Sequence, residues 1–181
     1  GPVAIHPRVY RAMSRVLYGH RTPEFQTVYK DITTLLKQLL QTDKDVLVFA
    51  GSGTAAMEAA IANLIEPGDN VLVAVNGYFS ERMVAMAQRY GATVDRQERS
   101  WGEIFDPAEI EKQLARKKYK LLAFVQAETS TGVLQLNVKE IAAAAHQPTR
   151  AEGPAGGTRR RRRGCHPSQG GYPVGISARD L

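Results

Sequence analysis

Short apolar runs alternate with stretches of helical periodicity through the first 147 residues, and this alternation limits the possible folds more than any other feature. Three runs, VLVFA (46–50), VLVAV (71–75) and LLAFVQ (121–126), are apolar at almost every position. Strands of this kind are buried on both faces, as happens when helices cover both sides of a mostly parallel sheet. The sequence therefore predicts an α/β fold, with a fourth short strand at 92–97.

Helices are expected between these strands, and their ends carry recognisable signals. A stripe of apolar residues predicts an amphipathic helix from Glu24 onward, after an irregular, proline-containing segment at 1–21. Asp106 followed by Pro107 is a helix start signal, and Gly91 is a helix stop signal. The further helices are predicted over 54–65, 78–90, 106–117 and 137–147.

The end of the chain differs in composition from the rest. Residues 148–181 hold 7 of the 24 Lys and Arg but only 2 of the 18 Asp and Glu, so that residues 1–147 are nearly neutral. A neutral body gives little support for a broad nucleic-acid-binding surface. We divide the chain into an N-terminal segment and helix (1–45), a partial α/β domain (46–147) and a Gly-, Pro- and Arg-rich tail (148–181) that is predicted to be disordered.

Three interpretations of this tail stay open. A flexible basic tail would bind nucleic acid or acidic lipid through Arg159–Arg163. A linker would lead to another domain. A shifted reading frame would turn Asp, Ala and Val codons of GC-rich DNA into Arg codons. We favour the shifted frame, because an α/β domain with this rhythm should continue with another strand and the sequence shows none.

The cysteine count and the hydropathy pattern narrow the classes of protein further. Cys165 is the single cysteine, so an internal disulfide framework and a four-cysteine metal cluster are excluded. No apolar run is long enough to span a bilayer, and the first residues have no signal-peptide pattern. We therefore expect a cytoplasmic protein without a metal site.

Polar residues follow the predicted strands at three junctions, where parallel sheets usually bind their ligands. At the first junction, Ser52, Gly53 and Thr54 open a helix. The unpaired backbone N–H groups and the dipole of such a helix start attract a phosphate group. The alternative interpretation is a plain N-cap that binds nothing.

The second and third junctions add an aromatic pair and a hydroxyl-rich loop. Tyr78 or Phe79 would lie against a planar cofactor, or would pack as a hydrophobic staple at the helix start. Glu128, Thr129 and the two hydroxyl residues after them suit polar ligand contacts, although a simple turn uses the same residues. Gly132 predicts a positive φ in this loop.

Five segments, in this order, resemble the class V pyridoxal-phosphate-dependent aminotransferases of fold type I. They are GPVAIHPRV (1–9), YGHRTPEF (18–25), GSGTAAMEAA (51–60), NGYF (76–79) and ETSTGVLQ (128–135). The likeness covers residues 1–147. It is greatest to the alanine–glyoxylate and serine–glyoxylate aminotransferases, and it extends to the small, tritium-exchange subunit of cyanobacterial soluble hydrogenases.

The resemblance implies pyridoxal 5′-phosphate as the cofactor and assigns roles to individual residues. It implies that Ser52, Gly53 and Thr54 hold the phosphate, that Phe79 stacks on the pyridine ring, and that Thr129 bonds near the ring's 3-hydroxyl group. It also implies that His20 and Arg21 lie near the active site and reach toward a dimer interface. A solvated or capping pair before the first long helix is the alternative for those two residues.

Two parts of the family pattern have no counterpart in this chain. The family uses an Asp, in a VDAV-type strand end, against the pyridine nitrogen, and a Lys, in an SGSQK-type segment, to form the Schiff base. Both follow the point that corresponds to Gln147, and the last lysine of this chain is Lys139, on a predicted helix. We therefore assign no catalytic residue and expect this chain alone to be inactive.

Three functions follow as expectations. The first is an aminotransferase that moves an amino group from a small amino acid to glyoxylate or another 2-oxo acid, working as a homodimer. The second is a soluble hydrogenase subunit, for which a partner must supply the redox centre because nickel–iron and iron–sulfur sites need several thiolates. The third, which the neutral body disfavours, is nucleic-acid binding through the arginine-rich tail.

Overall fold

The computed structural model describes residues 4–146 and 175–178. The chain divides into two compact units, Gly1–Phe49 and Ala50–Leu181, and each is described by itself.

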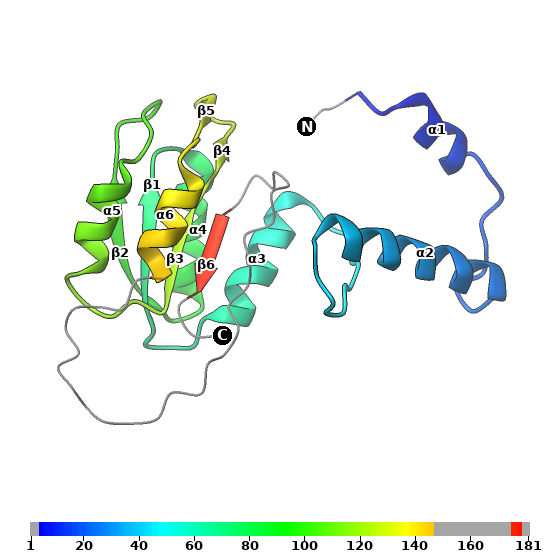
Figure 1. Ribbon diagram of the computed structural model, residues 1–181, viewed down its shortest axis with the longest axis horizontal. Helices are drawn as coiled ribbons and strands as arrows, with labels where there is room; N and C mark the ends of the chain where they lie inside the picture. The colour runs from blue at the N-terminus through cyan, green and yellow to red at the C-terminus, as the bar shows by residue number, and fades with distance from the viewer. Residues whose placement is uncertain (1–3, 147–174, 179–181) are drawn as a thin grey trace. The chain divides into compact units, whose positions relative to one another are not determined.

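A four-stranded sheet forms the centre of the second unit, in the order β2-β1-β3-β6 (Figure 1). Strand β1 (Asn70–Val75) lies in the middle and pairs in parallel with β2 (Thr93–Glu98) and with β3 (Leu121–Phe124). The mostly parallel sheet is as predicted, and these three strands start and end within two residues of their predicted bounds. Strand β6 (Gly175–Ala178) runs antiparallel to β3.

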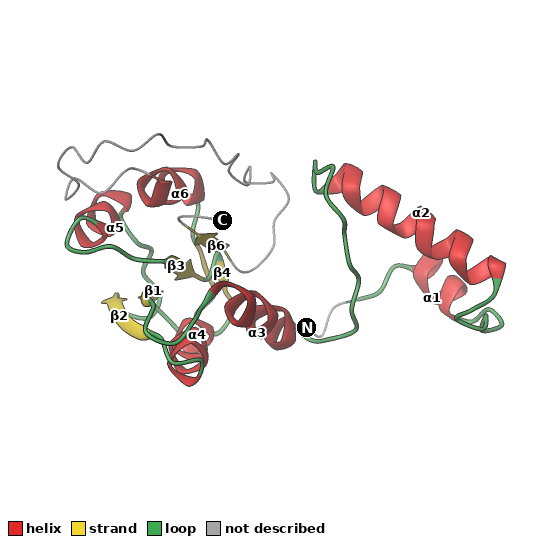
Figure 2. Cartoon of the chain, turned by 90° about the horizontal axis from the view of Figure 1, so that it is seen from below, coloured by secondary structure: helices red, strands yellow, loops and turns green. Residues whose placement is uncertain are grey.

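Helices cover both faces of this sheet, which makes a three-layer arrangement. Helices α3 (Gly53–Leu64) and α4 (Tyr78–Arg89) lie on one face, and α5 (Pro107–Leu114) and α6 (Val138–His146) lie on the other (Figure 2). Alternate residues of β1 point to opposite faces, so Val73 packs against α3 and α4 while Leu72 packs against α5 and α6. Two layers of apolar side chains explain why β1 and β3 are apolar at consecutive positions.

The predicted end signals of the helices work as expected. The Asp106 side chain accepts a hydrogen bond from the backbone N–H of Ala108, and Pro107 is the first residue of α5. Helix α4 ends before Gly91, which has φ +84. Gly91 also lies so close to Pro67 that an added Cβ would be 3.1 Å from the Cα of that proline. This close approach joins the end of α4 to the turn that precedes β1.

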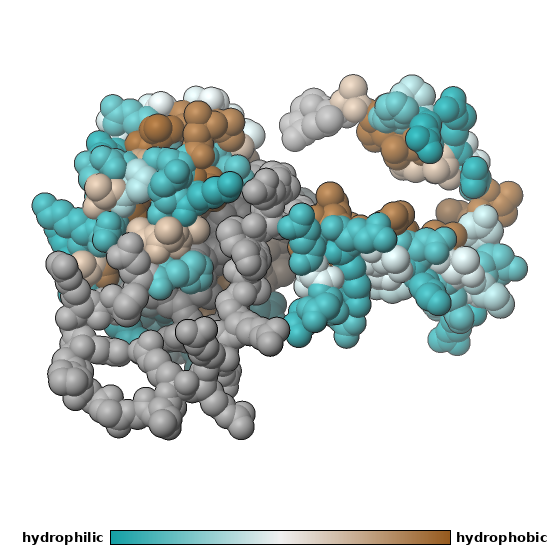
Figure 3. Space-filling view, in the orientation of Figure 1, coloured by the Kyte–Doolittle hydropathy of each residue, from teal (hydrophilic) through white to brown (hydrophobic). Residues whose placement is uncertain are grey.

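The described part of the first unit, residues 4–49, contains two helices, and neither has a buried residue. Helix α2 (Pro23–Leu39) confirms the predicted amphipathic helix, with Thr22 as its N-cap. Helix α1 (Pro7–Met13) corrects the prediction of an irregular segment over 1–21. The proline there does not break a helix, because it stands at the first helical position, where its missing N–H costs nothing. The apolar side chains of α2 gather along one side of the helix and stay exposed (Figure 3).

The predicted strand at 46–50 is absent from the structure. Residues 45–50 form no strand, and Leu47 and Phe49 are exposed. A strand needs a neighbouring backbone to satisfy its N–H and C=O groups, and the described part of the first unit consists of helices and loops. An apolar composition alone therefore did not make this run a strand.

The prediction that no strand follows residue 147 is also corrected, because β6 adds four residues to the sheet edge beside β3. The remainder of the tail, including Arg159–Arg163 and Cys165, lies outside the described residues. The interpretations of the tail as a nucleic-acid-binding segment or as a shifted frame therefore stay predictions. Within the described ranges, no helix is both long enough and apolar enough to cross a membrane.

Candidate functional site

The second and third predicted junctions meet at the carboxyl ends of β1 and β3. After β3 the chain forms a small hairpin from β4 (Ala127–Glu128) and β5 (Val133–Leu134). The four residues between these strands make the turn, and Gly132 has φ +71, as predicted. The hairpin places Glu128 and Ser130 at the start of α4.

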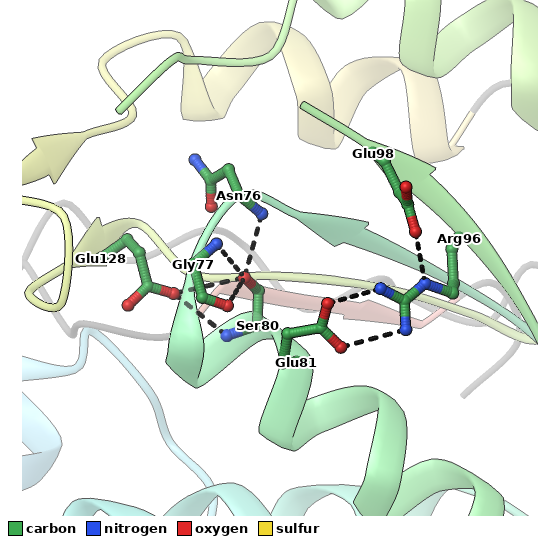
Figure 4. Close-up of polar contacts among 7 residues, drawn as sticks. All are labelled: Asn76, Gly77, Ser80, Glu81, Arg96, Glu98 and Glu128. Carbon is green, nitrogen blue, oxygen red and sulfur yellow. Dashed lines mark hydrogen bonds and ion pairs between the residues drawn. The ribbon is translucent and has the colours of Figure 1, made fainter. Parts of the chain in front are cut away.

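Three backbone N–H groups at the start of α4 donate to side chains of this hairpin. The N–H of Tyr78 donates to the Ser130 hydroxyl at 3.0 Å. The N–H groups of Phe79 and Ser80 donate to the two oxygens of the Glu128 carboxylate, at 3.3 Å and 3.0 Å. A helix cannot satisfy its own first N–H groups, so the hairpin acts as the cap of α4. Figure 4 shows the part of this cap in which Glu128 contacts Ser80.

Glu128 receives further hydrogen bonds. Its carboxylate accepts from the Ser130 hydroxyl at 2.6 Å and lies 3.2 Å from the Ser80 hydroxyl oxygen. That oxygen accepts in turn from the backbone N–H groups of Asn76 and Gly77, each at 3.0 Å. Glu128 is 1% exposed, so these donors, rather than water, stabilise its carboxylate.

Arg82 connects the first junction to the second. Its Nη1 donates to the Thr54 hydroxyl oxygen at 2.8 Å, and its Nη2 donates to the Tyr78 hydroxyl oxygen at 3.4 Å. The guanidinium carbon also lies 5.4 Å from the centre of the Tyr78 ring. A continuous set of contacts therefore runs from Thr54 through Arg82 and Tyr78 to Ser130.

The first junction has the geometry of an N-cap with free donors. The Ser52 hydroxyl oxygen accepts from the backbone N–H of Ala55 at 3.4 Å, so Ser52 is the N-cap of α3. Among the described residues, nothing accepts from the N–H groups of Gly53 and Thr54. A Cβ added at Gly53 would meet no atom within 4 Å, so the space around this helix start is open.

Phe79 and Thr129 take different positions at this edge of the sheet. Phe79 is half-buried and packs against the apolar cluster beneath α3 and α4, with its ring edge-on to Tyr78. Thr129 is exposed in the turn of the hairpin. Phe79 thus packs at the helix start without forming a hydrophobic staple, and part of its surface stays open.

His20 and Arg21 lie in the first unit, in the turn before α2. Both side chains are exposed, and the turn is closed by a hydrogen bond from the Thr22 N–H to the Gly19 carbonyl oxygen at 3.0 Å. Their predicted role near the active site stays a prediction.

Sequence reasoning missed the parts played by Gly77, Ser80, Arg82 and Glu128. Glu128 was noted only as one of several polar loop residues, and Arg82 was not singled out. The contacts of Glu128 with Ser80 span 48 residues, and that of Arg82 with Thr54 spans 28. A local pattern carries no signal for contacts of this separation.

A shallow hollow of about 320 Å³ lies at the opposite edge of the sheet, where the strands begin. The residues that line it are Gly68, Asp69, Asn70, Lys118, Tyr119 and Lys120. Because parallel sheets bind ligands at the carboxyl ends of their strands, this hollow is separate from the candidate site. No group of three or more His, Cys, Asp or Glu side chains in the described ranges is arranged to hold a metal ion.

Comparisons with known proteins assign this arrangement to a family. The model of the family described as "Aminotransferase class-V" matches residues 8–151. The (S)-ureidoglycine–glyoxylate transaminase of Bacillus subtilis is 38% identical over 133 residues, which are 73% of this chain and 32% of the relative. The "Soluble hydrogenase 42 kDa subunit" of Anabaena cylindrica is 38% identical over 137 residues, 74% of this chain and 36% of the relative.

Solved structures give the same result. An alanine–glyoxylate aminotransferase from Nostoc sp. is 42% identical, with a TM-score of 0.71, over 80% of this chain and 40% of that one. This chain thus spans between about a third and two fifths of the length of these relatives. The structural matches confirm the predicted fold type I architecture. With the family model covering most of the sequence, the chain belongs to the class-V aminotransferase family.

Proposed function

We propose that this chain is the cofactor-phosphate-binding part of an aminotransferase that moves an amino group from a small amino acid to glyoxylate or another 2-oxo acid. The observation that carries the proposal is the set of contacts that joins Thr54, Arg82, Tyr78 and Ser130 at the carboxyl edge of the sheet. The names of the similar glyoxylate aminotransferases support the reaction class.

The residues at the start of α3 fit the phosphate of pyridoxal 5′-phosphate. The Thr54 hydroxyl oxygen accepts from Arg82, so its own hydrogen is free to donate to a phosphate oxygen. The N–H groups of Gly53 and Thr54 and the Ser52 hydroxyl add donors, and the helix dipole adds partial positive charge. Arg82 supplies a full positive charge beside them, so the donor set is that of an anion site.

Phe79 and Thr129 are proposed to hold the ring. Phe79 would lie against the pyridine ring, and the Thr129 hydroxyl would bond near its 3-hydroxyl group. When bound, the pyridoxal group withdraws electrons from the substrate's α-carbon. The chain's own residues would bind and orient it, and we propose that without the family's Lys and Asp they do not complete a transamination. His20 and Arg21 would contribute near the substrate, in a cytoplasmic homodimer.

The proposal is tested with pyridoxine 5′-phosphate, which lacks the aldehyde and so cannot react with surface lysines. Isothermal titration calorimetry on the full chain compares it with pyridoxine, which lacks the phosphate. We expect binding of the phosphate ester to be at least about tenfold tighter. Arg82→Gln should weaken it about tenfold, because a charge-assisted hydrogen bond to the phosphate is lost.

Arg89→Gln is the matched control, since Arg89 is exposed in the last turn of the same helix. It should leave both affinities unchanged. Equal affinity of the wild-type chain for the phosphate ester and for pyridoxine would overturn the proposal.

The likeness to soluble hydrogenase subunits favours a second candidate function. The relative from Anabaena cylindrica matches this chain as well as the transaminase does. With one cysteine in the chain, a partner subunit would have to hold the redox centre. The native complex isolated through this chain separates the two functions: hydrogen-dependent reduction of viologen supports the hydrogenase role, and preferential binding of pyridoxine 5′-phosphate without hydrogen uptake supports the first.

A further inference from the structure

We infer that Glu128 is a positioning residue, which holds Phe79 and Thr129 in the relative arrangement that the pyridine ring of the cofactor requires. This inference rests on the proposed function and assigns to that site a residue that does not itself touch the ligand.

Glu128 takes the place of a cap that α4 cannot supply itself. The N-cap residue of α4 is Gly77, which has no side chain to accept from the following N–H groups. A Cβ added at Gly77 would lie 2.4 Å from the Glu128 Cγ and 2.8 Å from the Ser130 hydroxyl oxygen. The glycine therefore leaves the space into which the carboxylate of a distant loop enters.

The charge of Glu128 suits this place. It is buried at the positive end of a helix dipole, where a negative charge is stabilised. Within the described ranges, no Lys, Arg or His forms an ion pair with it, and its partners are backbone N–H and hydroxyl groups. Because a buried carboxylate is costly without such donors, the carboxylate and the start of α4 hold each other in one geometry.

The two residues assigned to the ring are attached directly to this carboxylate. The backbone N–H of Phe79 donates to its Oε1 at 3.3 Å, and Thr129 is its neighbour in the chain. Ser130 accepts from Tyr78 and donates to Glu128, which adds a second link between hairpin and helix. The separation of Phe79 from Thr129 thus depends on Glu128, whereas Ser52, Gly53 and Thr54 are held by α3 and Arg82.

This difference predicts a selective effect of Glu128→Gln. The amide has nearly the same size, but its NH₂ group would face N–H donors instead of accepting from them. We expect the affinity for pyridoxine 5′-phosphate to fall about tenfold, while the affinity for inorganic phosphate, followed by ³¹P NMR, stays the same. Glu111→Gln, an exposed position on α5, is the matched control and should change neither affinity.

A second variant keeps the test informative if Glu128→Gln does not fold. Ser130→Ala removes one link of the hairpin and leaves Glu128 bonded to Phe79 and Ser80, at an exposed position that tolerates the change. It should weaken pyridoxine 5′-phosphate binding about two- to threefold and leave phosphate binding unchanged. A parallel loss for both ligands in the variants would show a purely structural cap and overturn the inference.

The outcomes separate this inference from the proposed function. If the wild-type chain does not prefer pyridoxine 5′-phosphate over pyridoxine, the proposed function fails. If it does, and Glu128→Gln and Ser130→Ala bind like wild type, the cofactor site stands and the positioning role of Glu128 is wrong.

Discussion

Gly77 shows how one residue without a side chain determines the arrangement of its neighbours. Its φ of 177° is extended backbone that any residue adopts, so the need for glycine is steric. We predict that Gly77→Ala lowers the free energy of unfolding by about 2 kcal/mol, because the added methyl group must displace a buried carboxylate. Urea denaturation followed by circular dichroism measures the change.

Gly53→Ala is the control for stability, because a methyl group there enters open space at the first residue of α3. It should shift the free energy of unfolding by less than about 1 kcal/mol, in the stabilising direction. If Gly77→Ala is as stable as wild type, the close packing of Glu128 against Gly77 is wrong.

Residues whose role depends on near neighbours in the chain were predictable from sequence. Asp106 caps the helix that starts one residue later, and Gly91 and Gly132 take the backbone conformations that their turns require. Ser52 is the N-cap of α3, as its position before the helix indicated, and the role of Ser52 and Thr54 in phosphate binding stays a prediction. Glu128 and Arg82 contact residues that are 48 and 28 positions away in the sequence. Their roles become visible only in the folded structure, because the sheet brings them to these partners.

At the scale of elements, a side-chain pair ties β2 to the segment that leads into β3. The buried Tyr119 hydroxyl donates to the Asp95 carboxylate, and Lys117 lies 2.9 Å from the same carboxylate. The hydrogen bond from Tyr119, followed by that from Lys117, lowers the pKa of Asp95. Burial, followed by the hydrogen bond to Asp95, raises the pKa of Tyr119.

These shifts predict the pH dependence of stability. The lowered pKa of Asp95 stabilises the fold above the unfolded value of about 3.9, and this contribution is lost as the pH falls through the folded value. The raised pKa of Tyr119 contributes below about pH 10 and is lost as the pH rises beyond it. Tyr119→Phe should lower the free energy of unfolding by about 1 kcal/mol near neutral pH. It should also reduce the fall of this free energy on both flanks of its pH profile, the acid side and the alkaline side.

Urea unfolding of both proteins across the pH range tests this. Tyr29→Phe, on the exposed surface of α2, is the control and should leave both flanks unchanged. Unchanged flanks in Tyr119→Phe would show that the Tyr119–Asp95 pair does not contribute.

Elements were predictable from sequence where their own residues decide the outcome. Strands β1 and β3 are buried on both faces, and their apolar runs showed it. The run at 46–50 has a similar apolar composition. Whether it forms a strand depends on a neighbouring backbone from another part of the fold, which the residues of the run do not determine. Helix α1 lies in the segment that was predicted to be irregular and contains proline, although the first turn of a helix accepts proline.

The whole molecule combines one unit with a core and one whose described helices bury no residue. The second unit buries two apolar clusters on the two faces of its sheet, whereas α1 and α2 bury no residue. In proteins most of the stability of a helix comes from packing of its amphipathic face rather than from helix propensity. We predict that amides of Pro23–Leu39 exchange with deuterium at least about a hundredfold faster than those of β1 and β3.

Hydrogen exchange with mass spectrometry measures this on the full chain. Helix α4, which belongs to the second unit and has a buried face, is the internal control and should be protected. Equal protection of α2 and α4 would show that the first unit is stabilised as strongly as the second.

The capping of α4 by Glu128 has a consequence for the order in which this protein can become functional during translation. A ribosome completes β1 and the whole of α4 well before it adds Glu128, which follows Ser80 by 48 residues. Until then the nascent helix begins with three N–H groups that only water can satisfy. The start of α3, where we propose that the phosphate binds, is synthesised earlier still. The proposed anion site therefore precedes the proposed ring site in every newly made molecule, and both can exist together only after the hairpin has been translated.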